Sequence, residues 1–116
     1  MSNTALEIRE LRTGQSCIVA LSGRIDSTNS NDLMNRLNSL IRSGEKRILV
    51  DFESVLYLTS SAFRVLLIAT KEAERDAARI AFCSLNGHVR ELFEIGGLLD
   101  LFTIYPSRDD ALARLD

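Results

Sequence analysis

The sequence has few of the residues that catalytic and metal sites commonly use. Its 116 residues include one histidine, two cysteines and no tryptophan. His88 has no cluster of Cys or carboxylate residues at metal-ligand spacing near it, so we expect no metal site. The Gly-rich phosphate loops of nucleotide enzymes and the Gly-x-Ser-x-Gly motif of hydrolases are also missing. We therefore expect no catalytic residues, no enzyme activity and no cofactor.

Long apolar runs and a strong charge imbalance are missing as well. No apolar stretch approaches the roughly 20 residues of a membrane-spanning helix, and residues 1–8 are too polar for a signal peptide. The net charge of -2 provides no broad cationic surface for nucleic acid or anionic lipid. The sequence thus predicts a cytoplasmic protein that binds neither nucleic acid nor membrane directly.

The sequence around the two cysteines favours burial in the core over a disulfide or a redox site. Cys17 and Cys83 each lie within an apolar segment, and neither has a Cys-x-x-Cys neighbour, so both are expected to be buried as small hydrophobic residues. Hydrophobic residues make up 46% of the chain, which is enough for one core without cross-links. With no linker or repeat, residues 1–116 are expected to form a single domain.

The pattern of apolar residues predicts strands alternating with helices after an initial hairpin. The hairpin turns at Thr13-Gly14-Gln15, and a polar loop at 23–31 leads to a helix that stops at Gly44. The other helices are expected at 60–77, 87–95 and 107–115, and the strands at 6–11, 16–22, 46–52, 79–85 and 102–105.

These elements indicate an α/β fold with a mixed sheet and helices packed largely on one face. The nearly continuous apolar run at 46–52 is typical of a central strand that is buried on both faces. Asp51 ends that run and is expected to accept loop amides that shape the turn before Ser60.

Three consecutive hydroxyls, Thr59, Ser60 and Ser61, lie where the apolar segment 55–58 gives way to a helical pattern. Ser and Thr are ordinary N-capping residues, so a structural role as a cap is one interpretation. A hydroxyl at a helix start can also accept a phosphoryl group, because the new anion meets unpaired N–H groups and the positive end of the helix dipole.

The second helix carries a polar side that begins at Ser60 and continues through Arg64 and Lys71, with Ile68 as an apolar exception. This strip resembles a docking surface with an apolar centre and a polar rim, although a single exposed aliphatic residue is also common. The charges at 71–76 are expected to be a solvated face. Asp26 is expected to be a turn residue or a cap for the first helix.

Several segments, in this order along the chain, resemble a STAS domain, and within that family most closely the bacterial anti-sigma factor antagonists. They are residues 19–26, 48–52, 55–67, 96–98 and 102–105. The resemblance covers nearly the whole chain. It implies a STAS-like mixed sheet with an N-terminal β-hairpin.

In those antagonists the second helix begins with the pattern Asp-Ser-Ser-Gly-Leu-Gly, and a partner kinase phosphorylates the first serine. Here Thr59 takes the Asp position and Ser60 the acceptor position, followed by Ser61, and residues 62–64 (Ala, Phe, Arg) take Gly, Leu and Gly. The resemblance implies a module that sequesters an anti-sigma factor and is released from it when a serine kinase phosphorylates Ser60. It implies a partner surface formed by Asp26, Thr59, Ser60, Ser61, Arg64 and Ile68.

Two other functions stay open at this point. The chain could be a STAS subunit of another complex, such as a regulator of a transport ATPase, in which the hydroxyls only contact the partner. It could also be a small nucleotide-binding or hydrolysing protein. Weak nucleotide binding without turnover would agree with the resemblance, whereas hydrolysis by the pure protein would favour an enzyme.

Overall fold

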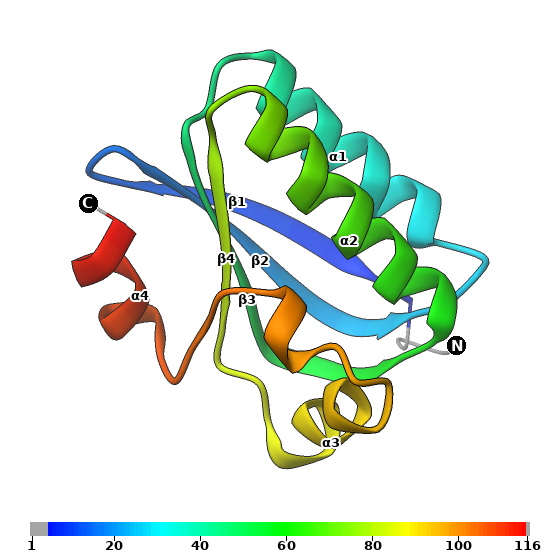
Figure 1. Cartoon of the computed structure of the whole chain (residues 1–116). Coiled ribbons are helices and arrows are strands. Elements are labelled where there is room, and N and C mark those ends of the chain that lie inside the picture. Colours follow the sequence, from blue (N-terminus) through cyan, green and yellow to red (C-terminus); the bar gives the residue numbers. More distant parts are fainter. Residues whose placement is uncertain (1–4, 116) are drawn as a thin grey trace.

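The computed structural model describes residues 5–115 as a mixed sheet of five strands with four helices and one 3-10 turn (Figure 1). The elements are β1 (Glu7–Thr13), β2 (Ser16–Ile25), α1 (Ser30–Arg42), β3 (Arg47–Leu58), α2 (Ser60–Arg75), β4 (Arg79–Cys83), α3 (Gly87–Ile95), η1 (Leu99–Leu101), β5 (Ile104–Tyr105) and α4 (Arg108–Leu115). None of these helices is both long and apolar enough to cross a bilayer.

The chain opens with the predicted hairpin, in which β1 runs antiparallel to β2. Gly14 adopts a φ of 61° in the turn, a conformation that favours glycine. β2 continues past its predicted end to Ile25, with irregular pairing to β3 near Ser22 and Gly23. Residues 23–25 of the predicted loop therefore belong to the strand, whereas residues 26–29 do form a loop and α1 begins at Ser30.

From β2 onward the sheet is parallel, with the strand order β1-β2-β3-β4-β5. β3 is central, as predicted, but it runs six residues further than Phe52, to Leu58. Glu53 and Ser54 are exposed and interrupt the apolar run, whereas Val55 and Leu58 return to the core. Since parallel strands end at the same edge, β2 and β3 both deliver the chain to the edge where α2 begins.

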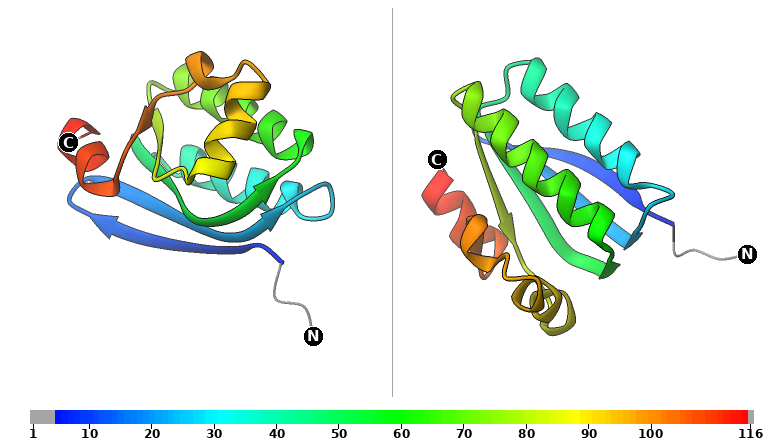
Figure 2. Two further views of the ribbon diagram at one scale, coloured as in Figure 1. Left: turned by 90° about the horizontal axis from the view of Figure 1, so that it is seen from below. Right: turned by 45° about the vertical axis from the view of Figure 1, so that its right-hand side comes forward.

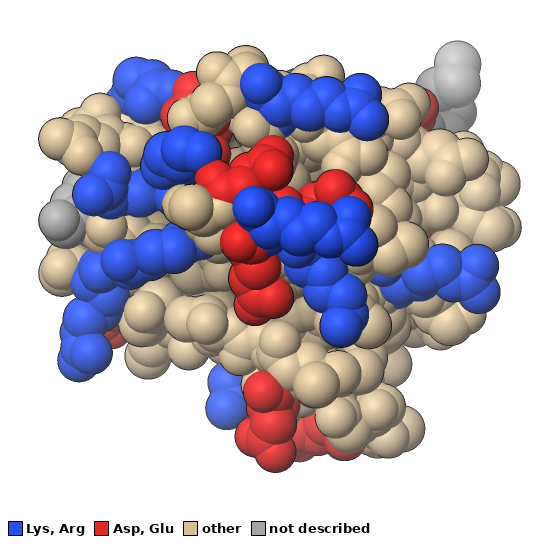
Figure 3. All heavy atoms as spheres, turned by 45° about the horizontal axis from the view of Figure 1, so that its top comes forward, with Lys and Arg blue, Asp and Glu red and all other residues tan. Residues whose placement is uncertain are grey.

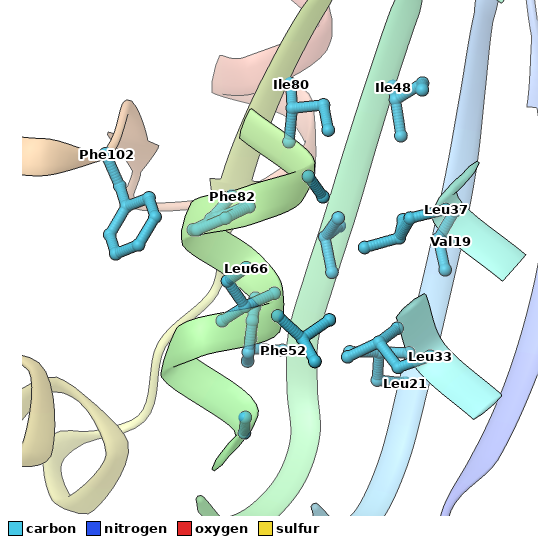
Figure 4. Packing of buried hydrophobic residues seen from close by; sticks show 14 of the residues in the cluster. Val19, Leu21, Leu33, Leu37, Ile48, Phe52, Leu66, Ile80, Phe82 and Phe102 are labelled. Atoms are coloured by element: carbon cyan, nitrogen blue, oxygen red, sulfur yellow. The ribbon is translucent and has the colours of Figure 1, made fainter. Parts of the chain in front are cut away.

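The main core lies between the sheet and the helices α1, α2 and α3. In Figure 4, buried side chains of α1 and α2 meet those of the three central strands: Leu33, Leu37, Leu66, Val19, Leu21, Ile48, Phe52, Ile80 and Phe82. Phe93 of α3 packs edge-on against Phe63 of α2, with ring centroids 4.9 Å apart. Full burial of such a side chain contributes about 1.5–3 kcal/mol, so these contacts fix α3 and α2 on the sheet.

α4 covers the other face of the sheet, so the helices lie largely, but not entirely, on one face. Figure 2 shows α4 apart from α1 and α2, which run side by side. α4 packs Ala111 and Leu115 onto a second cluster with Ile18, Leu49, Ala81 and Cys83.

Asp51 helps to hold α4 in place and does not shape the turn before Ser60, so that prediction was wrong. Its buried carboxylate pairs with Arg108 of α4 at 2.8 Å and accepts the amide of Glu53 at 2.9 Å. Asp51 lies in the middle of β3, and seven more strand residues separate it from the helix start. The prediction failed because β3 is longer than the apolar run suggested.

Both cysteines are buried, as predicted, and burial raises the pKa of each thiol. The pKa of Cys83 rises from 9.0 to about 11, because the thiolate would lose its hydration in the second cluster.

The raised pKa of Cys83 makes the folded state sensitive to alkali. The unfolded thiol loses its proton near pH 9.0 while the folded one keeps it up to about 11, so unfolding is favoured as the pH rises through this interval. We expect the free energy of unfolding to fall by up to about 2–3 kcal/mol between about pH 8 and pH 11. Urea unfolding across this range, with Cys83→Ala as the matched variant, measures it. An identical pH dependence in both proteins would contradict the assignment.

Candidate functional site

The junction between β3 and α2 forms the candidate site. Thr59 has an extended backbone (φ -104°, ψ 176°), and α2 begins at Ser60, as predicted. The Thr59 amide donates to the carbonyl of Ile25, with N and O 3.0 Å apart. This bond joins the ends of β2 and β3 and places the start of α2 beside the loop that follows β2.

Thr59 occupies the N-cap position, but its hydroxyl does not cap the helix. It lies 2.9 Å from the Ser61 hydroxyl and 3.4 Å from the carbonyl of Ile25, and no side chain caps α2 by a hydrogen bond. The first turn of α2 also lacks an acidic residue. The N–H groups of Ala62 and Phe63 donate to the Thr59 carbonyl, and among residues 5–115 no side chain or acidic residue accepts a hydrogen bond from the start of α2.

Ser60 is the accessible member of the three hydroxyls. Its side chain is exposed, and in the part of the chain that the structure describes its hydroxyl has no hydrogen-bond partner. Thr59 and Ser61 are half-buried and bonded to each other. A modifying enzyme or a partner would meet Ser60 first.

Arg64 and Ile68 follow Ser60 on the exposed side of α2, as predicted. Ile68 is 39% exposed and borders a groove of about 310 Å³ between α1 and α2, which Met34 and Ile41 also line. The surface over these two helices carries Lys and Arg side chains around a central group of Asp and Glu (Figure 3). Ile68 therefore borders a groove that both apolar and charged side chains line, on a surface whose middle is acidic.

Asp26 is a turn residue in the loop between β2 and α1, as expected. Its carboxylate accepts hydrogen bonds from the Thr28 amide at 2.9 Å and from the Thr28 hydroxyl at 2.5 Å. These bonds hold the pKa of Asp26 below its usual value, because they favour the charged form. Ile25, the preceding residue, bonds to Thr59, so the loop lies next to the three hydroxyls.

The sequence analysis missed a stacked group at the same edge of the sheet. Tyr57 lies between the Arg24 guanidinium, 5.5 Å from its ring centroid, and the His88 ring, 5.8 Å away and nearly parallel. Leu56 beside it is 58% exposed. In the sequence, Leu56 and Tyr57 belong to the apolar segment 55–58, and no local pattern joins them to Arg24 or His88.

Asn86 fixes this group to the sheet. Its side chain accepts the Val89 amide, which caps α3, and donates to the carbonyl of Val55, both at 2.9 Å. His88 is an exposed residue in the first turn of α3. Among residues 5–115, no group of three or more His, Cys, Asp or Glu side chains is arranged to hold a metal ion.

The fold is that of a known family. The model of the STAS domain matches residues 7–111, so the chain belongs to the STAS domain family. It is 34% identical over 96 residues to BtrV of Bordetella bronchiseptica, a protein named as an anti-sigma factor antagonist, with 83% of each chain covered. The family prediction is therefore confirmed.

Solved structures of similar proteins confirm the fold. An anti-sigma factor antagonist from Mycobacterium paratuberculosis superposes with a TM-score of 0.88 at 18% identity, covering 98% of this chain and 97% of the other. SpoIIAA of Bacillus in its phosphorylated form gives 0.71 at 20% identity, covering 97% and 100%. Because anti-sigma factor antagonists are non-enzymatic regulators, the prediction that the chain is not an enzyme is also confirmed.

Proposed function

We propose that this chain is an anti-sigma factor antagonist, a module that binds and sequesters an anti-sigma factor. The observation that carries the proposal is the 34% identity to BtrV across 83% of both chains. Specific protein binding needs a surface and no catalytic group, and the start of α2 with the adjoining loop supplies one.

The binding is controlled by phosphorylation of Ser60 by a serine kinase. Two observations support this part of the proposal. The Ser60 hydroxyl is exposed at a helix start, and the structurally similar SpoIIAA exists in a phosphorylated form. A phosphate adds about 1.5 to 2 negative charges, which a partner that fits a neutral hydroxyl must desolvate or repel.

The docking surface combines the polar helix start with the apolar strip beyond it. Ile68 supplies the apolar centre, and Arg64 and Ser60 lie on the same side of α2. The half-buried Thr59 and Ser61, together with the Asp26 turn, form the neighbouring rim. Because the backbone here is already fixed by the strand ends, release needs a change of charge and no change of fold.

If the chain is phosphorylated, Ser60 is expected to be the acceptor. Thr59 and Ser61 are half-buried and engage each other, so their hydroxyls are less accessible to a kinase. Incubation with a serine kinase of the anti-sigma type encoded beside this gene, followed by mass spectrometry of the peptides, locates the phosphate. Phosphate found only on Thr59 or Ser61 would contradict the assignment of the acceptor.

A negative charge at position 60 is expected to weaken partner binding without harming the fold. We expect Ser60→Asp to lose about tenfold or more in affinity, since an opposed or desolvated charge costs on the order of 1–3 kcal/mol. Stability should change by a few tenths of a kcal/mol at most, because an acidic group is favourable at a helix start. Calorimetric titration and thermal melting measure the two effects.

Two control variants test whether the loss of affinity in Ser60→Asp depends on the charge being at position 60. Ser39→Asp places the same charge on an exposed serine in the last turn of α1 and should bind like the unmodified protein. Ser60→Ala should bind normally but resist release by the kinase and ATP. A large loss of stability in Ser60→Asp, or full binding by it, would refute Ser60 as an exposed switch.

A further inference from the structure

We propose that Arg64 holds the phosphate of phosphorylated Ser60 against the first turn of α2 and so masks part of its charge. This inference rests on the proposed function, because it concerns the phosphorylated state of that same site. It assigns to Arg64 a role in setting how completely phosphorylation releases the partner.

The spacing on α2 brings the two side chains together. Ser60 and Arg64 are four residues apart on one exposed side of the helix, which makes them neighbours one turn apart. Side chains of an α-helix lean toward its N-terminus, so the Arg64 side chain extends over the turn that Ser60 begins. An anion placed four residues before a cation is also the more favourable order along a helix.

Arg64 has a free guanidinium for this purpose. Ion pairs in the described residues engage five other arginines: Arg12, Arg36, Arg75, Arg90 and Arg108. Arg64 has no such partner within residues 5–115. Its helical neighbours three and four residues away are Ser60, Ser61, Leu67 and Ile68, none of which carries a carboxylate. Arg75, by contrast, pairs with Glu72 three residues before it.

The surroundings of Ser60 favour the same arrangement. The first turn of α2 has no acidic residue and no side-chain cap, since the Thr59 hydroxyl is turned to Ser61 and to the carbonyl of Ile25. A phosphate on Ser60 would therefore meet no competing anion in that turn, and Arg64 can donate two hydrogen bonds to its oxygens. The paired phosphate presents less charge to a partner than a free one.

The titration of the phosphate tests the pairing without any partner. Phosphoserine is installed at position 60 by genetic encoding, and the second pKa of the phosphate is followed by ³¹P NMR. A nearby cation favours the dianion, so we expect this pKa to be about half a unit to one unit lower in the otherwise unchanged protein than in Arg64→Ala. Arg64→Lys should recover part of the shift. Alanine is preferred to glycine here because glycine would itself weaken the helix.

Lys71→Ala is the matched control, since it removes an exposed cation from the same helix two turns further on. It should titrate like the unchanged protein, and circular dichroism should report the same helix content in all variants. Equal phosphate pKa values with and without Arg64 would overturn the inference. An equal shift in Lys71→Ala and Arg64→Ala would also overturn it, because it would show a general charge effect.

Affinity for the anti-sigma factor tests the consequence. We compare how many times more tightly the unphosphorylated form binds than the phosphorylated form. This ratio should be at least about tenfold larger in Arg64→Ala than in the unchanged protein. An unchanged or smaller ratio would overturn the masking. A shifted phosphate pKa in a protein that binds no anti-sigma factor would instead support the pairing and refute the proposed function, so the two failures are distinguishable.

Discussion

The burial of β3 between two parallel neighbours is the constraint on which the rest of the molecule depends. β3 pairs with β2 along most of its length and with β4 over residues 47–51. It carries the main core on one face and α4 on the other, and it ends at Leu58 beside Ile25. The last link is the bond from the Thr59 amide to the carbonyl of Ile25. Because the strand cannot shift without exposing both cores, the start of α2 has a fixed position and direction.

In the proposed function, this fixed helix start allows a small chemical change to act as a switch. The exposed Ser60 hydroxyl projects from a rigid edge, so a phosphate there changes the surface charge while the packing of Ala62 and Leu66 beneath stays intact. The same edge carries the stack of Arg24, Tyr57 and His88, which adds aromatic surface next to the loop. Under the proposed function, a partner bound at this edge would contact two regions. One is the helix start, whose charge changes with phosphorylation of Ser60, and the other is this stack, whose contacts do not involve Ser60.

Local features of the sequence predicted much of the fold and of the candidate site. The turn at Gly14 and the helix 87–95 follow directly from glycine and capping residues, and the phase of α2 correctly placed Ser60, Arg64 and Ile68 on its exposed side. The failures involve contacts between distant segments. The pairing of Asp51 with Arg108 and the direction of the Thr59 hydroxyl depend on elements that meet only in the folded chain. Hydrophobic periodicity and secondary-structure propensity do not predict contacts between segments that are far apart in the sequence.

The central claim is that an anti-sigma factor docks on the start of α2 and the adjoining loop. Amide chemical shifts of the labelled chain, recorded with and without an anti-sigma factor from the same organism, test it most directly. The account predicts the largest changes at Asp26 and along 59–68, and their loss when Ser60 carries phosphate. Changes centred instead on the opposite edge of the sheet, at Lys46, Arg47 and Arg79, would contradict it.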